Sequence, residues 1–352
     1  MSKFFSSKYA SLVPYTPGEQ PRDMQYIKLN TNESPFSPSA KAQAAASEAA
    51  KNLQLYSDPT AKKLNDAMAE LYGVDPDCVL MTNGSDEVLN FAFMAFCDET
   101  RPAVFADITY GFYSVFADIN RLPSTVIPLR DDFTLSVDDY IGVPGTVFIA
   151  NPNAPTGLLV PTSEIERLLR ADPNRIVVID EAYVDFGGES CIPLTKKYDN
   201  LLVTGTFSKS RSMAGARLGF GIASKELIGD LNTIKYSTNP YHVNSMTMAA
   251  GIGCISDEEY TRENCRKIIK AREYTTKELQ KLGFTLTDSK TNFVFAKHPE
   301  ISGQELYQKL RQRGILVRHF SSPKIADYNR ITIGTMEQMQ VLVQTVKEIL
   351  GK

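Results

Sequence analysis

Five short apolar runs constrain what this chain of 352 residues can fold into. Each run is rich in β-branched residues, lacks polar–apolar alternation, and is followed by polar residues and then a helix-like stretch. The runs are residues 78–82, 102–107, 146–151, 175–180 and 201–205. Strands that are apolar on both faces are typical of a parallel sheet covered by helices on each side. The order therefore predicts an α/β fold around a mostly parallel sheet.

The length of the chain and a change in its character near residue 257 predict two domains. We expect residues 40–256 to form the large domain, which holds all five apolar runs. Residues 257–352 start with a long charged helix-like segment and then mix strands with helices, which predicts a smaller α+β domain. Residues 1–39 are rich in Pro, Ser and Asn and are expected to form an extended arm that belongs with this smaller domain.

The composition of the chain bears on its binding partners, on metal sites and on its cellular location. A net charge of −3 argues against nucleic acid or an anionic membrane as the main partner. The five cysteines show no CxxC spacing, and an odd, scattered set fits a reducing compartment. The three histidines lie far apart, which argues against a histidine-based metal site. Because no apolar run is long enough to span a bilayer, we expect a cytoplasmic protein.

The residues that directly follow the apolar runs form the candidate site, because ligands of open parallel sheets bind beyond the carboxyl ends of the strands. Taken singly, each has an ordinary structural explanation as a helix cap, a core aromatic, a turn or a solvated charge. Taken jointly, complementary groups after five consecutive strands favour a ligand site. The groups are Ser85, Asp86, Tyr110, the loop 151–157 with sequence NPNAPTG, Asp180, Tyr183, Thr206, Ser208, Lys209 and, eight residues further on, Arg217.

The chemistry of these groups predicts one cofactor. A helix N-terminus with hydroxyls and an arginine binds an anion, and a tyrosine face accommodates a flat ring. A buried carboxylate keeps a ring nitrogen protonated, and a lysine forms a Schiff base with an aldehyde. A phosphate, an aromatic ring, a ring nitrogen and an aldehyde together describe pyridoxal 5′-phosphate. Lys209 is then the Schiff-base lysine, and Arg217 is a phosphate ligand.

Three segments carry a resemblance to a known family. Residues 208–220 (SKSRSMAGARLGF) resemble the lysine segment of the fold-type I, class I and II aminotransferases, NPNAPTG resembles their NPxNPTG loop, and DEAYVDF (180–186) resembles their acidic–tyrosine segment. More narrowly, segments from PYTPGEQ (14–20) to NRITIGT (329–335) are similar, in order, to the histidinol-phosphate aminotransferase family. The resemblance implies the fold-type I architecture of PLP-dependent transferases and a homodimer.

The resemblance also implies an activity, which is transamination between L-histidinol phosphate and 2-oxoglutarate in histidine biosynthesis. Aromatic aminotransferases and decarboxylases of phosphorylated amino acids, such as threonine phosphate, have similar segments and are the alternatives. A non-catalytic regulatory protein with the same fold is a further alternative, against which the intact Lys209, Asp180 and Arg217 argue.

Residue roles follow from the resemblance. Lys209 would carry the Schiff base and move a proton, Asp180 would pair with the pyridinium nitrogen, and Tyr183 would hydrogen-bond the ring oxygen O3′. Tyr110 would stack on the ring. The phosphate would be held by backbone N–H groups of Ser85 and Asp86, by Thr206, Ser208 and Arg217, and by Tyr56 of a neighbouring subunit. The substrate would contact Arg330, Arg318, Tyr15 and Asn292.

The chain departs from the family at several positions. Ala154 stands where the family loop has the asparagine that precedes Pro-Thr-Gly, so its contact with O3′ is either lost or made by Asn153. Phe36 replaces a frequent tyrosine, and Ser210 and Arg211 follow the lysine where smaller or apolar residues are usual.

Overall fold

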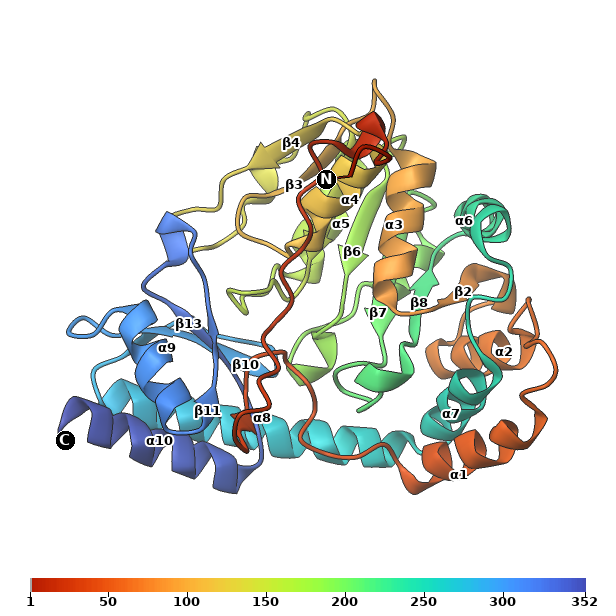
Figure 1. Ribbon diagram of the computed structural model, residues 1–352. Helices are drawn as coiled ribbons and strands as arrows, with labels where there is room; N and C mark the ends of the chain where they lie inside the picture. Colours follow the sequence, from red (N-terminus) through yellow and green to blue (C-terminus); the bar gives the residue numbers. More distant parts are fainter. Residues whose placement is uncertain (1) are drawn as a thin grey trace.

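The structure is a computed structural model that describes residues 2–352, and its larger sheet confirms the predicted α/β fold. This seven-stranded sheet has the order β2-β8-β7-β6-β5-β3-β4, in which β8 runs antiparallel to its neighbours and the other described strands are parallel (Figure 1). The strands are β2 (Val79–Thr82), β3 (Ala103–Ala106), β4 (Ser124–Ile127), β5 (Thr146–Ala150), β6 (Val177–Asp180), β7 (Leu201–Thr206) and β8 (Gly219–Ile222). The predicted runs correspond to β2, β3, β5, β6 and β7. The analysis of apolar runs missed β4, which is mostly exposed, and β8, whose sequence GFGI is half glycine.

Both faces of this sheet are buried, which explains why its strands lack alternation. Phe148, Val178 and Leu202 point into one core, while their neighbours along β5, β6 and β7 point into the core on the opposite face. The first core is covered by α3 (Ser85–Phe96), α4 (Phe112–Asn120) and α6 (Lys225–Thr238). The second is covered by α1 (Ala40–Ala49), α2 (Lys62–Tyr72), α5 (Thr162–Ala171) and α7 (Ser245–Ile255).

A smaller antiparallel sheet of order β12-β13-β10-β9 has its own core, formed with three helices. Its strands are β9 (Thr285–Leu286), β10 (Phe293–Lys297), β12 (Arg318–His319) and β13 (Asn329–Thr332). The helices are α8 (Glu258–Lys281), α9 (Gly303–Gln312) and α10 (Met336–Leu350). Within the described residues, no helix combines the length and the apolar character needed to cross a membrane.

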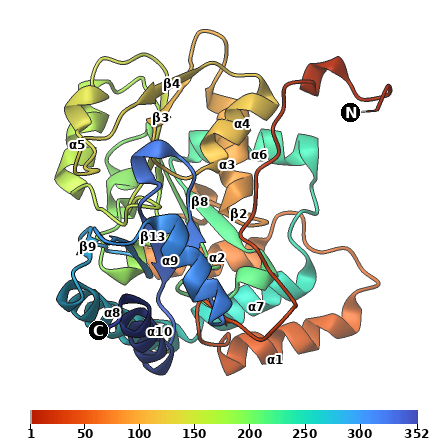
Figure 2. The same cartoon turned by 60° about the vertical axis from the view of Figure 1, so that its left-hand side comes forward.

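The N-terminal arm is tied to the smaller sheet region by a separate pair of strands. β1 (Ile27–Lys28) pairs in parallel with β11 (Ile315–Leu316). Figures 1 and 2 show the arm running from beside α4 of the large part down past the smaller sheet before it reaches α1. The domain boundaries at residues 39/40 and 256/257 stay a prediction.

Arg211 joins the segment that carries Lys209 to the start of α8. Its side chain is only 4% exposed, and its Nη1 lies 2.7 Å from Glu258 Oε2, at the first residue of that helix. The guanidinium also lies 5.2 Å from the Phe207 ring centroid, and the hydroxyl of the preceding Ser210 donates to Asp185. The polar residues that follow Lys209 therefore anchor this segment.

Replacement of Arg211 tests this anchor. Arg211→Ala removes the buried cation of Glu258 and leaves only the exposed Arg262, 3.7 Å from its carboxylate, so we expect the free energy of unfolding to fall by about 3 kcal/mol. The control is Lys51→Ala, whose pair with Glu48 is exposed (68% and 71%) and is expected to change stability little. Urea unfolding measures both, and equal effects of the two variants would contradict an anchoring role for Arg211.

Candidate active site

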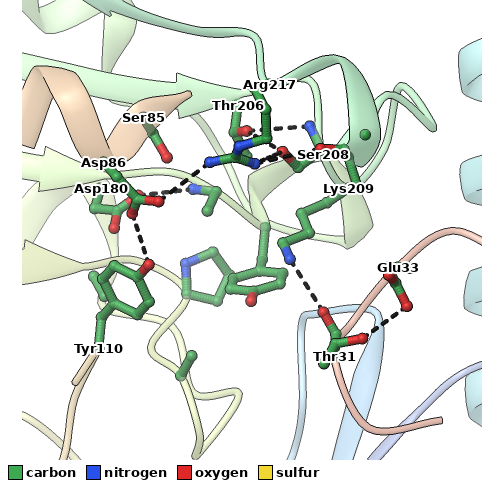
Figure 3. A pocket seen from close by; sticks show the side chains of 17 residues that line it. Thr31, Glu33, Ser85, Asp86, Tyr110, Asp180, Thr206, Ser208, Lys209 and Arg217 are labelled. Carbon is green, nitrogen blue, oxygen red and sulfur yellow. Dashed lines mark hydrogen bonds and ion pairs between the residues drawn. The ribbon is translucent and has the colours of Figure 1, made fainter. Parts of the chain in front are cut away.

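Two adjoining cavities lie where the carboxyl ends of the central strands face the smaller sheet region. The first encloses about 330 Å³ and contains most of the predicted cofactor residues (Figure 3). The second encloses about 380 Å³ and shares Thr31, Tyr110, Ala154, Tyr183 and Lys209 with the first. Predicted residues that line the first cavity are Ser85, Asp86, Tyr110, Asp180, Tyr183, Thr206, Ser208, Lys209 and Arg217. Those that line only the second are Tyr15, Arg318 and Arg330.

One end of the first cavity is suited to an anion. The first turn of α3 presents the backbone N–H groups of Ser85 and Asp86, which donate to no backbone carbonyl within residues 2–352. Arg217 Nη1 lies 3.3 Å from Ser208 Oγ, and Thr206 Oγ1 donates to the same oxygen at 3.0 Å. Gly84 permits this approach, because at its φ of 85° an added Cβ would lie 2.5 Å from Arg217 Nη2.

Asp180 forms the opposite end of the first cavity. It ends β6 and is 5% exposed. Within residues 2–352 its side chain accepts hydrogen bonds only from neutral donors, the Tyr113 hydroxyl at 3.2 Å and the Ala182 N–H at 3.2 Å. Burial, together with the negative charge of Asp86, raises the pKa of Asp180 to about 7. A cationic or N–H-bearing group of a ligand would relieve this unfavourable burial.

The negative charge of Asp86, which lies beside the anion end, is compensated by its partners. Its carboxylate forms an ion pair with Arg217 Nη2 at 3.3 Å and accepts the Tyr110 hydroxyl at 2.7 Å. Burial and the Asp86 charge raise the pKa of Tyr110, so this phenol stays neutral and its ring lines both cavities. The Tyr110 ring is itself fixed by edge-on packing against Tyr113.

Lys209 lies where the two cavities meet. Its Nζ donates to the Thr31 carbonyl oxygen at 3.3 Å and lies 5.8 Å from the Tyr183 ring centroid. Tyr183 follows β6 and lines both cavities, and its hydroxyl accepts a hydrogen bond from Asn32 Nδ2 at 2.9 Å. An amine at this position can reach ligands in either cavity.

The second cavity is suited to another anion. Arg330 and Arg318 lie opposite each other on β13 and β12. Arg330 Nη2 donates to the Asn30 carbonyl at 3.0 Å, and burial, with a contribution from the charge of Arg318, lowers its pKa. Arg318 donates to the carbonyls of Thr16 and Pro17, which holds the arm over the cavity, and the Tyr15 ring packs 4.4 Å from Phe112.

Three predicted residues line neither cavity. The Asn153 amide donates to Ile108 O at 2.9 Å and Thr156 Oγ1 at 3.0 Å, and its oxygen accepts the Thr109 hydroxyl. Of the two alternatives for the missing loop asparagine, these contacts favour a lost contact over one made by Asn153. Ala154 lines both cavities in its place. Asn292 is fully buried and donates to the Asn32 carbonyl. Tyr56 is 84% exposed and stacks on Tyr241.

Residue-by-residue reasoning missed Thr31, Asn32 and Tyr113. Thr31 and Asn32 belong to the segment LNTNESP of the arm, whose polar residues after a short apolar stretch were a signal, but their contacts with Lys209 and Tyr183 span more than 150 residues. Tyr113 lies in the first turn of α4, and the turn that joins it to Tyr110 brings the two rings into edge-on contact.

Comparisons with known proteins agree on one family. The sequence profile described as "Aminotransferase class I and II" matches residues 24–346. A histidinol-phosphate aminotransferase from Brachyspira hyodysenteriae is 48% identical over 352 residues, 99% of each chain. One from a Marinomonas species is 48% identical over 354 residues, 99% of this chain and 100% of the relative. The fold resembles the crystal structure of histidinol-phosphate aminotransferase from Sinorhizobium meliloti in complex with pyridoxal-5′-phosphate (TM-score 0.90, 22% identity, covering 99% and 98%).

The raised pKa of Asp180 predicts how its replacement affects the ligand-free protein. Between the unfolded-chain pKa of 3.8 and about 7, the folded state keeps a proton that the unfolded state has lost, so this group lowers stability as the pH rises through that window. Asp180→Asn should therefore raise the free energy of unfolding at pH 8 by on the order of 4 kcal/mol, with the gain shrinking toward pH 4. Urea unfolding across this range is the measurement. The exposed Asp131→Asn serves as control, and a gain for Asp180→Asn that does not vary with pH would contradict the assignment.

Proposed function

The chain belongs to the class I and II aminotransferase family, and from that membership we propose that it is a histidinol-phosphate aminotransferase that uses pyridoxal 5′-phosphate. It transfers the amino group of L-glutamate to imidazole-acetol phosphate and yields L-histidinol phosphate and 2-oxoglutarate, a step of histidine biosynthesis. The observation that carries the proposal is the position of Lys209, whose amine lies between one cavity with an anion end at Arg217 and a second with an arginine pair.

The first cavity fits this cofactor. Its anion end offers the first turn of α3, Thr206, Ser208 and Arg217 to a phosphate, and its other end offers a buried carboxylate without a cationic donor to a ring nitrogen. When bound, the cofactor supplies an electron-accepting ring conjugated to a carbon that bonds to amines. Asp180 would hold the ring-nitrogen proton, and Tyr110 would cover the ring and exclude water from that side.

Lys209 and Tyr183 would contact the part of the cofactor where substrate reacts, at the junction of the two cavities. Lys209 Nζ, held near the Thr31 carbonyl, is the group placed to accept a proton from substrate and to return it. Tyr183 supplies a hydroxyl beside it, oriented by Asn32.

The second cavity would hold the substrates. Histidinol phosphate carries a phosphate and no α-carboxylate, whereas glutamate carries carboxylates, so one subsite must accept both kinds of anion. Arginine binds either group through paired N–H donors. The half-buried Arg330 would gain most from an anion, because desolvation disfavours its unpaired charge. Tyr15 and the arm would close this side of the cavity.

We also propose a cytoplasmic homodimer. Tyr56 (84% exposed), Leu53 (55%), Leu55 (66%) and Tyr241 (43%) form an exposed apolar patch that a second copy of the chain would cover, bringing Tyr56 to the phosphate end of the partner's site. The cytoplasmic location is supported by the five cysteines, all of which are free. Sedimentation analysis tests the dimer, and a fully active monomer would contradict it.

A substrate panel tests the function. With the cofactor-loaded protein, single-turnover absorbance changes should be fastest for histidinol phosphate and glutamate among amino donors that also include phenylalanine. Lys209→Ala should lower turnover by roughly two to four orders of magnitude, because the proton carrier is removed. Faster reaction with phenylalanine, or decarboxylation of threonine phosphate, would contradict the substrate assignment and leave the family unchanged.

The arginine pair should separate the two half-reactions. Arg330→Ala is expected to impair both, and Arg318→Ala to impair the histidinol-phosphate half-reaction more, because a phosphate dianion uses more donors. Loss of one charge-assisted contact should lower kcat/KM by about thirtyfold, on the order of 2 kcal/mol. Arg313→Ala, at an exposed arginine that lines neither cavity, is the control. Equal losses in both half-reactions for Arg318→Ala would contradict its selective role.

A further inference from the structure

The Tyr183 hydroxyl has a single hydrogen-bond partner within residues 2–352. That partner is Asn32 Nδ2, at 2.9 Å, and it is a donor. The phenol oxygen therefore accepts, and its own proton has no acceptor in the described part of the chain. Tyr183 lines both cavities, so the space available to that proton is the cavity interior.

The direction of the Asn32 amide is determined by Thr332. The Asn32 backbone N–H donates to Thr332 Oγ1 at 3.0 Å, and the Thr332 hydroxyl donates to Asn32 Oδ1 at 2.9 Å. If the amide were reversed, the proton of this buried hydroxyl would lose its acceptor, which costs free energy in an apolar environment. The amide oxygen therefore faces Thr332, and the NH₂ group faces Tyr183.

The backbone of Asn32 is fixed as firmly as its side chain. The residue is 1% exposed and has a φ of 56°, a left-handed conformation that asparagine and glycine tolerate best. Asn292 Nδ2 donates to its carbonyl oxygen at 2.9 Å. Contacts from β13 and from the residue before β10 thus hold Asn32 from two sides.

The neighbouring loop residues Asn153 and Ala154 offer no substitute for the Tyr183 hydroxyl. Ala154 lines both cavities and has no polar side-chain atom, and Asn153 next to it is turned away with its amide donors occupied. The hydroxyl of Tyr183 can therefore supply the donor toward the ring oxygen of the bound ligand that the loop does not supply.

We propose that Asn32 is a positioning residue that makes Tyr183 an obligatory donor toward the negatively charged ring oxygen of the cofactor. The proposal rests on the proposed function, because it needs a cofactor with such an oxygen. A donor stabilises negative charge on that oxygen and weakens its hold on a neighbouring proton. The protein thereby lowers the pKa of the bound chromophore through Asn32, which contacts Tyr183 and not the cofactor.

The test follows the visible absorbance of the cofactor-loaded protein as a function of pH. Asn32→Asp keeps the shape and the left-handed backbone but offers an acceptor, which turns the Tyr183 hydroxyl away from the cofactor. We expect the chromophore pKa to rise by about one unit, comparable to the effect of Tyr183→Phe. Asn32→Gly keeps the backbone and removes both the donor to Tyr183 and the acceptor of the Thr332 hydroxyl without adding an acceptor for Tyr183, so a smaller rise is expected. Thr332→Val should also raise the pKa, and Thr332→Ser should restore it.

A double-mutant comparison separates this role from a general structural one. In the Tyr183→Phe background, Asn32→Gly should cause no further shift, because Asn32 acts through the hydroxyl. Asn329→Asp is the matched control, since Asn329 is equally buried, lies on β13 and bonds Gly303 O without lining either cavity. It is expected to leave the chromophore pKa unchanged even if the melting temperature falls.

The outcomes distinguish the two proposals. Two results would overturn the positioning role alone. One is an equal shift of the chromophore pKa by Asn32→Gly with and without the Tyr183 hydroxyl. The other is an unchanged chromophore pKa in the Asn32 variants while the wild-type protein shows a normal pH-dependent visible band. A wild-type protein that shows no such band with pyridoxal 5′-phosphate would overturn the proposed function and this proposal with it.

Discussion

Burial of the large sheet on both faces is the constraint on which the rest of the structure depends. Because α-helices cover each face, the strands can be parallel, and the carboxyl ends of β5, β6 and β7 come to one edge of the sheet. Asp180 ends β6, and Lys209 follows β7 by three residues. The parallel pairing of β6 with β7 therefore brings groups that are far apart in the sequence to one cavity.

The chemistry of the site arises from groups of opposite charge that lie at the two ends of the first cavity. Arg217 and the first turn of α3 make one end of the first cavity positive, while Asp180 at the other end is negative only when it is ionised. Asp86 lies between them and would repel an anion if it were free, but its pairing with Arg217 and Tyr110 offsets its charge. The cavity thus matches a ligand that is anionic at one end and has an N–H group at the other.

The parts that could be predicted from sequence are those determined by local pattern. Apolar runs predicted five of the seven strands of the large sheet. Residues that follow them, such as Asp180 and Lys209, line one cavity, and their roles there stay a prediction. Asn153 shows the limit, because its neighbours Pro152 and Ala154 line the first cavity while its own amide is used in contacts within the protein. Asn32 shows another, since its role depends on contacts with Thr332 and Asn292, about 300 and 260 residues away.

The arm provides what the sheet edge alone cannot, a common support for groups that belong to different parts of the chain. Three consecutive residues contact three site residues: the Asn30 carbonyl accepts from Arg330, the Thr31 carbonyl accepts from Lys209, and the Asn32 amide donates to Tyr183. The same segment is attached to the smaller sheet region through the pairing of β1 with β11. A shift of this segment would therefore disturb the contacts of Arg330, Lys209 and Tyr183 together, so the position of the arm links the two cavities.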